Sequence, residues 1–318
     1  MRNLFGLLIL AVAVFPMSAA DPIPWAYAIP AAPPAGTPAA TPAAPDTSVK
    51  HLEGSSGAFT RAQISDRFGP ADWYPGDHPP MPPVVAHGVQ PAVRACAGCH
   101  LTNGAGHPES SGLAGLPVNY IIRQMADFKN GHRQGGRSGN MITFAAVITD
   151  EDTRAAAEYF AALKSPPWTK VIETDTVPET FVGAGAMRFV KPGGGSEPIG
   201  NRIIVVPQDA ARASSRDSRS GFIDYVPVGS IKRGEALVTT GDNGKTVPCG
   251  ICHGLDLKGR AEMPPLAGRT GIYLVRQLND MQIGKRTGVN VALMKPVVAK
   301  LTADDMVAIA AYLASREP

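Results

Sequence analysis

Residues 96–100 read Cys-Ala-Gly-Cys-His, and residues 249–253 read Cys-Gly-Ile-Cys-His. These two pentapeptides contain all the cysteines of the 318-residue chain. A disulfide framework gives no reason for two such pairs, each followed at once by a histidine. The pattern instead indicates covalent haem attachment, in which two thiols on one helical turn form thioethers with the haem vinyl groups. The adjacent histidine then offers a ring nitrogen to the iron.

Other sites also use a Cys-x-x-Cys pair, notably redox-active dithiols and zinc sites. A thioredoxin-like dithiol would lie in a βαβ pattern, which the sequence does not show. A zinc site pooled from both pairs would need them to converge from opposite halves of the chain, and would leave the histidine after each pair unexplained. We therefore predict two haem c groups, bound covalently by Cys96, Cys99, Cys249 and Cys252.

An internal repeat extends beyond these motifs. When the sequence is shifted by 153 positions (249 minus 96), His100 falls on His253 and Leu113–Gly115 falls on Leu266–Gly268. Further pairs coincide under the same shift: Tyr120 and Tyr273, Arg123 and Arg276, Gln124 and Gln277, Arg133 and Arg286, Met141 and Met294, Thr149 and Thr302, and Tyr159 and Tyr312. One supersecondary unit has therefore been used twice.

The repeat narrows the choice of the second axial ligand of each iron. The second unit offers Met263, Met281, Met294 and Met306, and its one histidine is His253. Under the shift, only Met141 and Met294 correspond to each other. Because histidine and methionine are a standard axial pair for haem iron, we predict ligation by His100 with Met141 and by His253 with Met294.

Additional residues are candidates for the surroundings of the haems. The carbonyls of Gly112 and Pro265 are expected to accept the second ring N–H of His100 and His253. The arginines that repeat between the units could bind haem propionates or face solvent: Arg123, Arg276, Arg133 and Arg286. Tyr120 and Tyr273 either pack at a haem edge or take part in ordinary helix packing.

The N-terminal part of the chain contains two segments that differ in composition from the repeated units. Residues 1–20 combine a polar start, a short apolar run and small residues ending at Ala20, which predicts a cleaved export signal. A retained anchor is the alternative, although the run is shorter than the roughly 20 residues that span a bilayer. Residues 21–82 are rich in proline and alanine and predict an extended tether, with Trp73 and Tyr74 as candidate anchors.

The repeated units, residues 83–165 and 230–318, are expected to be helical. Apolar residues recur on one helix face in 120–128 and in 273–281. Thr149 and Thr302 each precede an aspartate by three positions, as at a helix start, and alanine-rich helices are expected over 154–163 and 307–315. Another helix is expected over 232–240. The connector, residues 166–229, carries β-like runs at 202–206 and 222–226 and predicts an ordered strap with one or two short strands.

Taken together, these residues resemble the class I cytochromes c, and within them the dihaem proteins of the c-four type. The resemblance covers about 84–164 and 235–316 and rests on Cys-x-x-Cys-His, Leu-Ala-Gly, Tyr-x-x-x-Gln, Gly-x-Arg, the methionine and the Thr-x-x-Asp helix start. It implies an all-α fold of two tandem domains joined by an irregular or short-β connector. The chain departs from the pattern in its proline-rich extension, its long connector and Gly112 in place of proline.

The resemblance implies a periplasmic dihaem carrier of single electrons that is not itself an enzyme. Its partners would be redox proteins, namely a dehydrogenase, an oxidase or a membrane quinol-oxidising complex. The alternative is an obligate cytochrome subunit of a periplasmic dehydrogenase. A haem enzyme such as a peroxidase needs an iron with an open coordination position. The presence of Met141 and Met294 argues against such a position. With a net charge of +3 and no basic run, nothing indicates nucleic-acid binding, and no transmembrane span is expected after signal cleavage.

Overall fold

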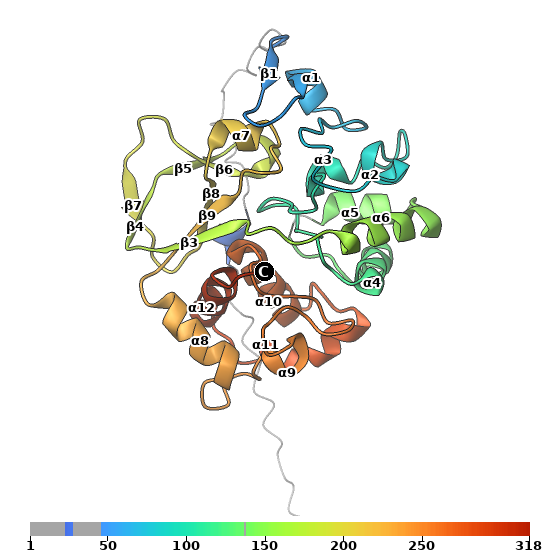
Figure 1. The fold of residues 1–318 in the computed structure, drawn as a ribbon. Coiled ribbons are helices and arrows are strands. Elements are labelled where there is room, and N and C mark those ends of the chain that lie inside the picture. The colour runs from blue at the N-terminus through green and yellow to red at the C-terminus, as the bar shows by residue number, and fades with distance from the viewer. Residues whose placement is uncertain (1–22, 28–45, 137) are drawn as a thin grey trace, which may run out of the picture.

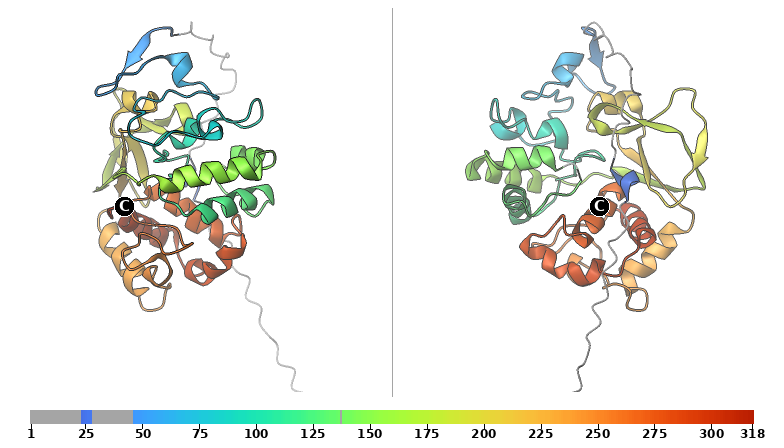
Figure 2. Two further views of the ribbon diagram at one scale, coloured as in Figure 1. Left: turned by 45° about the vertical axis from the view of Figure 1, so that its right-hand side comes forward. Right: turned by 180° about the vertical axis from the view of Figure 1, so that it is seen from behind.

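A computed structural model describes residues 23–27, 46–136 and 138–318 of the chain (Figure 1). The predicted export signal, residues 1–20, lies outside these ranges. Within them, no helix combines the length and the apolar character that crossing a bilayer requires. The two repeated units lie one above the other, and the connector forms a β-rich layer beside both (Figures 1 and 2).

The first unit consists of helices, as predicted. These are α2 (Pro83–Ala86), α3 (Ala97–His100), α4 (Val118–Lys129), α5 (Gly139–Ala145) and α6 (Asp150–Ala162). The hydroxyl of Thr149 caps α6 by accepting a hydrogen bond from the Asp152 N–H at 3.0 Å, which confirms the predicted start signal. Helices α4 and α6 pack together around a buried core that includes Val85, Ala157 and Phe160.

The second unit repeats this arrangement, with a longer helix before its motif. It contains α8 (Ser230–Thr240), α9 (Gly250–His253), α10 (Gly271–Gln282), the 3₁₀ turn η3 (Val289–Leu293), α11 (Lys295–Val298) and α12 (Ala303–Ala314). Thr302 and Asp305 form a reciprocal capping box, so α12 begins directly after Thr302. Helix α12 is buried from Asp305 to Ala314 because α8, α10 and the connector all pack against it.

The connector forms most of the β-structure. Its main sheet has the order β3 (Thr169–Glu173), β9 (Phe222–Val226), β8 (Ile204–Pro207), with β3 parallel and β8 antiparallel to β9. Two small antiparallel pairs join β4 (Thr176–Pro178) to β7 (Ser196–Pro198) and β5 (Thr180–Val182) to β6 (Arg188–Val190). The turn η2 (Ala184–Ala186) and helix α7 (Ala210–Ser214) complete it. The strands predicted at 202–206 and 222–226 are confirmed as β8 and β9.

The expectation of an all-α fold is wrong. The described residues contain nine strands in four sheets, including β1 (Val49–His51) and β2 (Ala58–Thr60), which precede α1 (Arg61–Ile64) in the extension. Six of these strands have only three residues, which is too short to show a two-residue period, so the sequence pattern did not reveal them. The main sheet also packs on α10 and α12. The connector is therefore part of the core of the second unit rather than a strap.

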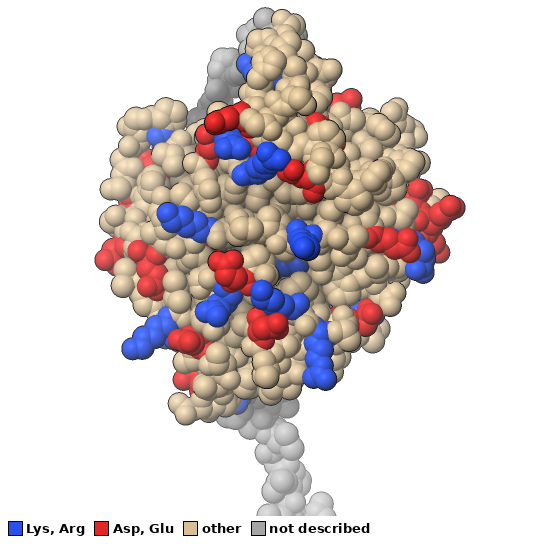
Figure 3. Space-filling model, in the orientation of Figure 1, with Lys and Arg blue, Asp and Glu red and all other residues tan. Residues whose placement is uncertain are grey.

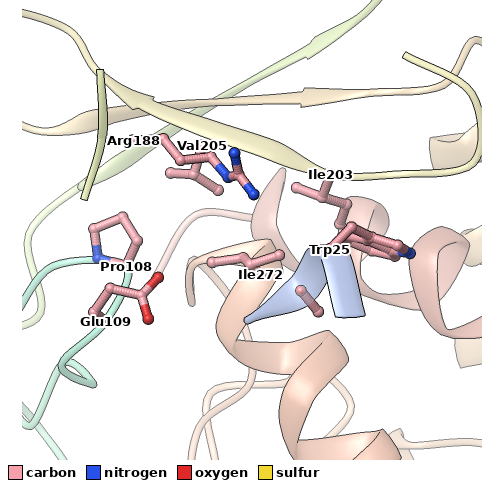
Figure 4. A pocket seen from close by; sticks show the side chains of 8 residues that line it. Trp25, Pro108, Glu109, Arg188, Ile203, Val205 and Ile272 are labelled. Carbon is pink, nitrogen blue, oxygen red and sulfur yellow. The ribbon is translucent and has the colours of Figure 1, made fainter. Parts of the chain in front are cut away.

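The first described residues likewise differ from the predicted tether. Ala26, the last residue of the 3₁₀ turn η1 (Pro24–Ala26), and Ile23, which precedes this turn, are buried in the core of the second unit. The Tyr27 hydroxyl donates to the Asp280 carboxylate at 2.7 Å. Apolar burial and this hydrogen bond fix the segment where composition alone suggested an extended chain. A small hollow remains beside it, lined by Trp25, Pro108, Glu109, Arg188, Val205 and Ile272 (Figure 4).

The later part of the extension, residues 46–82, also forms a packed structure. Trp73 and Tyr74 are buried with Ile64 and Ala71 in a small apolar cluster. On the face shown in Figure 3, lysine and arginine side chains lie interspersed with aspartate and glutamate. Charge on this face is therefore mixed rather than segregated.

Candidate cofactor sites

Each Cys-x-x-Cys-His motif forms a single helical turn. Cys96 precedes α3 and Cys249 precedes α9. The N–H of His100 donates to the Cys96 carbonyl at 2.9 Å, and the N–H of His253 donates to the Cys249 carbonyl at 2.9 Å. This turn brings both thiols and the imidazole close together, and all four thiols are free of disulfide bonds. Covalent haem attachment needs this arrangement.

Both motif histidines are held in the tautomer that an iron ligand requires. His100 Nδ1 lies 2.8 Å from the Ser111 carbonyl, and His253 Nδ1 lies 2.8 Å from the Pro264 carbonyl. Since a carbonyl can only accept a hydrogen bond, Nδ1 carries the proton and Nε2 keeps its lone pair. Burial lowers the pKa of both histidines below its ordinary value, which favours the neutral ring. Each ring therefore presents Nε2 to a metal.

The carbonyls that hold these rings differ from the predicted ones. Gly112 and Pro265 were expected to accept the histidine N–H, but the acceptors lie one residue earlier. The register of each loop is set by a backbone hydrogen bond, from the Leu113 N–H to the Gly104 carbonyl at 2.7 Å and from the Leu266 N–H to the Leu257 carbonyl at 2.8 Å. In this register the Gly112 carbonyl instead accepts from Arg269 Nη1 at 2.7 Å.

Two of the four predicted arginines meet across the boundary between the units. Arg133 Nη2 donates to the Tyr273 hydroxyl at 3.3 Å, and Arg286 Nη2 donates to the Tyr120 hydroxyl at 2.9 Å. Each arginine also donates to the glutamines of both units at 2.9–3.1 Å. We call this group the arginine–tyrosine cluster: Tyr120, Gln124, Arg133, Tyr273, Gln277 and Arg286. Its reciprocal contacts follow the sequence repeat.

The positive charges in and beside the arginine–tyrosine cluster favour the binding of an anion. Burial raises the pKa of Tyr273, but the nearby charges of Arg133, Arg286 and Arg269 outweigh it, so the pKa is lowered overall. The buried Nε of Arg286 has no hydrogen-bond partner among the described residues. A buried guanidinium with an unmet donor is costly unless a partner binds it. Haem propionates have the charge and the acceptor oxygens to fit this cluster.

The other two repeated arginines, Arg123 and Arg276, form ion pairs within the chain. Arg123 Nη2 pairs with Glu262 of the second unit at 3.3 Å. Arg276 pairs with Glu109 at 3.0 Å and donates to the carbonyls of Pro108 and Ala26. These contacts join segments of the chain and leave Arg123 and Arg276 no part in the arginine–tyrosine cluster, although both repeat in the sequence.

The structure places Met141 in α5 and Met294 between η3 and α11, where Met294 packs against the core of the second unit. Both methionines are partly buried. The zinc alternative finds no support: in the described part of the chain, no three histidine, cysteine or carboxylate side chains gather as metal ligands.

Sequence reasoning missed several residues of these sites. Gln124 and Gln277 coincide under the shift, so the repeat contained a signal for them. Arg269 had no such signal because Leu116 occupies its place in the first unit. Nevertheless, it reaches across to the Gly112 and Ala114 carbonyls, next to the loop that holds His100.

Known proteins support this description. The sequence profile named cytochrome c matches residues 231–317. The chain is 40% identical over 70 residues to cytochrome c-554(548) of Halomonas halodenitrificans, covering 22% of this chain and 84% of that protein. It is 25% identical over 234 residues to the thiosulfate dehydrogenase electron acceptor of Stutzerimonas stutzeri, covering 72% and 82%. It is 24% identical over 242 residues to cytochrome c4 of Stutzerimonas stutzeri, covering 72% and 87%.

Proposed function

This chain belongs to the cytochrome c family, and we propose that it is a periplasmic carrier of single electrons with one covalently bound haem in each repeated unit. When bound, the haem iron supplies a one-electron redox couple. The observation that carries the proposal is the duplicated turn in which Cys-x-x-Cys is followed by a buried, neutral histidine with its Nδ1–H already donated. Other metal sites have no need for this combination in duplicate.

The chain's own residues would fix the properties of each site. The carbonyls of Ser111 and Pro264 hold the imidazoles in one orientation, which keeps Nε2 aimed in one direction. Met141 and Met294 would supply the second axial ligand, and a thioether ligand raises the reduction potential. With both axial positions taken by side chains, the sites would exchange electrons without binding a substrate. This role places the protein among carriers rather than enzymes.

The arginine–tyrosine cluster would bind propionates of both haems. Its two guanidinium groups each bond to side chains of both units. Propionate groups bound to these arginines would therefore lie between the two units. The cluster would thereby fix the two units relative to each other and neutralise the buried charge on both sides of the boundary.

Haem content and ligation test this proposal in protein purified from a host competent in haem maturation. We expect two non-extractable haems per chain and an absorbance band of sulfur–iron charge transfer for both. The variants Met141→Leu and Met294→Leu should each lose about half of this band, and Met125→Leu should keep it, because Met125 has no methionine counterpart under the shift. Fewer than two bound haems in the unaltered chain would refute the proposal.

A second candidate is a stable cytochrome subunit of a periplasmic dehydrogenase. It is favoured by the relatives named thiosulfate dehydrogenase electron acceptor and cytochrome subunit of sulfide dehydrogenase. Purification from the native host at moderate salt distinguishes the two. A stoichiometric enzyme that stays bound through size-exclusion chromatography indicates a subunit, whereas a free dihaem chain indicates a carrier.

A further inference from the structure

Helix α7 of the connector ends on an arginine whose backbone conformation favours glycine. Arg216 has a φ of 57°, in the left-handed region, where the β-carbon of an ordinary residue is crowded. Its N–H donates to the Ala213 carbonyl at 3.0 Å. The next N–H, of Asp217, donates to the Arg212 carbonyl at 3.1 Å. These two bonds form a Schellman motif, in which the left-handed position is usually glycine. Arginine is less stable there than glycine, which directs attention to its side chain.

The guanidinium of Arg216 lies against the first motif turn. Its Nη1 is 4.0 Å from where the β-carbon of a Gly98 side chain would begin. Asn103 Nδ2 donates to the Ser218 carbonyl at 2.6 Å, which holds residues 214–220 beside this turn. Figure 1 shows α7 next to α3. Arg216 is partly buried, and in the described part of the chain no acceptor forms a hydrogen bond with its guanidinium.

The N-terminal extension fixes the end of α7 in this position. Trp73 Nε1 donates to the Ser215 carbonyl at 2.7 Å, and Arg61 Nη1 donates to the Ser214 carbonyl at 2.8 Å. The last carbonyls of a helix have no partner within the helix, so these bonds satisfy them from another part of the chain. Movement of α7 away from the first motif would break both bonds.

The cations near Arg216 add to its positive charge. Burial and the charges of Arg61 and Arg94 lower the pKa of Arg216. A guanidinium nevertheless stays protonated near neutral pH, because its ordinary pKa is above 12. Three positive charges therefore lie close to the first motif.

The carboxylates of this region do not cancel these charges. Asp217, the acidic residue of segment 214–220, is already paired with Arg212 at 2.5 Å. Asp152 acts on Cys96 at the start of the motif. Under the shift of 153, Asp305 takes the place of Asp152 in the second unit, so this carboxylate is common to both units.

The second motif lacks the corresponding cations and cover. Val247 stands in the place of Arg94, and the connector that carries Arg216 occurs once in the chain. Ile251, the counterpart of the buried Gly98, is 63% exposed. Water screens charges beside an exposed turn, whereas a charge beside a covered turn acts through a less polar medium. An electrostatic effect of Arg216 should therefore be confined to the first unit.

We infer that Arg216 raises the reduction potential of the first haem and so favours the first unit when both haems share one electron. Ferric haem takes up one electron from a redox partner and becomes ferrous, which lowers its charge by one. A cation nearby therefore stabilises the ferrous state, and the cover strengthens the effect by excluding water. The inference rests on the proposed function, since it assumes a haem at each motif.

Redox titration of the holoprotein, followed by NMR, tests this role. The amide signals of Gly98 and Ile251 report the oxidation state of the haem at their own motif. At a fixed potential, Arg216→Gln should lower the reduced-to-oxidised ratio of the first haem about three- to tenfold, equivalent to about 28–59 mV, and that of the second by less than about twofold. Arg216→Lys keeps the charge and should leave the first ratio within about twofold.

A matched control removes an exposed cation from the same unit. The side chain of Arg154 is 61% exposed. Because water and salt screen its charge, Arg154→Gln should leave both ratios within about twofold of those of the unaltered protein. The effect of Arg216→Gln should persist at high salt, since Arg216 is partly buried.

Arg216→Gly separates the charge from the backbone. Glycine adopts a positive φ without crowding, so this variant should unfold at an equal or higher urea concentration than the unaltered protein. It should nevertheless lower the potential of the first haem as Arg216→Gln does. A glycine variant that is less stable and keeps the potential of the first haem would show a packing role and overturn the inference.

The remaining outcomes separate this inference from the proposed function. An unchanged first potential in Arg216→Gln, equal shifts at both haems, or an equal loss in Arg216→Lys would each overturn the role of Arg216. Haem content and the charge-transfer band are recorded on the same samples. Fewer than two haems in the unaltered chain would refute the proposed function itself. Two haems ligated by methionine, with a first potential that does not respond to Arg216, would count against this inference alone.

Discussion

A buried carboxyl between the connector and the second unit should make the stability of this protein fall as pH rises. Asp224 lies in β9 with its side chain fully buried. Its Oδ2 accepts a hydrogen bond from the N–H of Gly271, the first residue of α10, at 2.5 Å. Its Oδ1 has no hydrogen-bond partner among the described residues. Burial raises the pKa of Asp224 to about 7.

The size and the sign of this pH dependence follow from the difference between the pKa of Asp224 in the folded and in the unfolded chain. The folded state holds the proton more tightly than the unfolded chain, whose pKa is near 3.8. The stability that the group contributes is therefore complete below pH 3.8 and is lost as pH rises toward 7. A tenfold change in proton affinity is worth about 1.36 kcal/mol, so the loss is about 4 kcal/mol at most. The hydrogen bond from the Gly271 N–H, which lowers the pKa, is already included in this figure.

The substitution Asp224→Asn removes the titration and keeps an oxygen that can accept the Gly271 N–H. We expect the variant to be more stable than the unaltered protein by roughly 2–4 kcal/mol at pH 7.5, and by no more than about 0.5 kcal/mol at pH 4. The measurement is urea denaturation of the holoprotein at both pH values. Comparing variant with unaltered protein at each pH cancels the pH dependence of the haems, which both share.

Asp305→Asn provides a matched control of opposite sign. Asp305 is also buried, but Lys245 and Arg233 lie 2.6 and 2.5 Å from its oxygens. Burial raises its pKa, yet these contacts and the Thr302 N–H outweigh burial and lower the pKa to about 2. The contribution of Asp305 is therefore present at neutral pH and lost in acid, so its Asn variant should be destabilised at pH 7.5. If Asp224→Asn gave no pH-dependent gain, the reasoning about a costly buried carboxylate would be refuted.

Three further substitutions test the packing and the contacts between the units. Gly234→Ala should destabilise the protein by at least about 1–3 kcal/mol in denaturant melts, because its methyl group would clash with the Ala308 carbonyl where α8 crosses α12. Gly139→Ala, in α5 with open space around it, should instead stabilise by about 0.5–1 kcal/mol; equal effects would contradict the packing argument. Arg269→Lys keeps the charge but loses the paired bonds to Gly112 and Ala114, and should shift the NMR signals of the His100 ring while those of His253 stay in place. Equal shifts at both rings would contradict a role confined to the first unit.

The residues that carry the chemistry were identifiable from the sequence because that chemistry fixes their type and spacing. Two thiols and a histidine must share one turn, so Cys96–His100 and Cys249–His253 are visible without any structure. The repeat located Met141 and Met294, whose role as ligands stays a prediction. Helices long enough to show a 3.6-residue period, such as α4 and α10, were also predicted correctly.

Only the tertiary structure decided which repeated residues meet and which part of the chain lies over the first motif. Arg133 and Arg276 both belong to arginine pairs that repeat in the sequence. Yet Arg133 donates to Tyr273 of the second unit, whereas Arg276 pairs with Glu109. The placement of residues 214–220 beside the first motif, the docked Ile23–Tyr27 segment and the short strands depend on contacts between residues far apart in the chain. Such contacts leave no local period in the sequence, because their energy comes from burial and hydrogen bonds that exist only after the units have packed together.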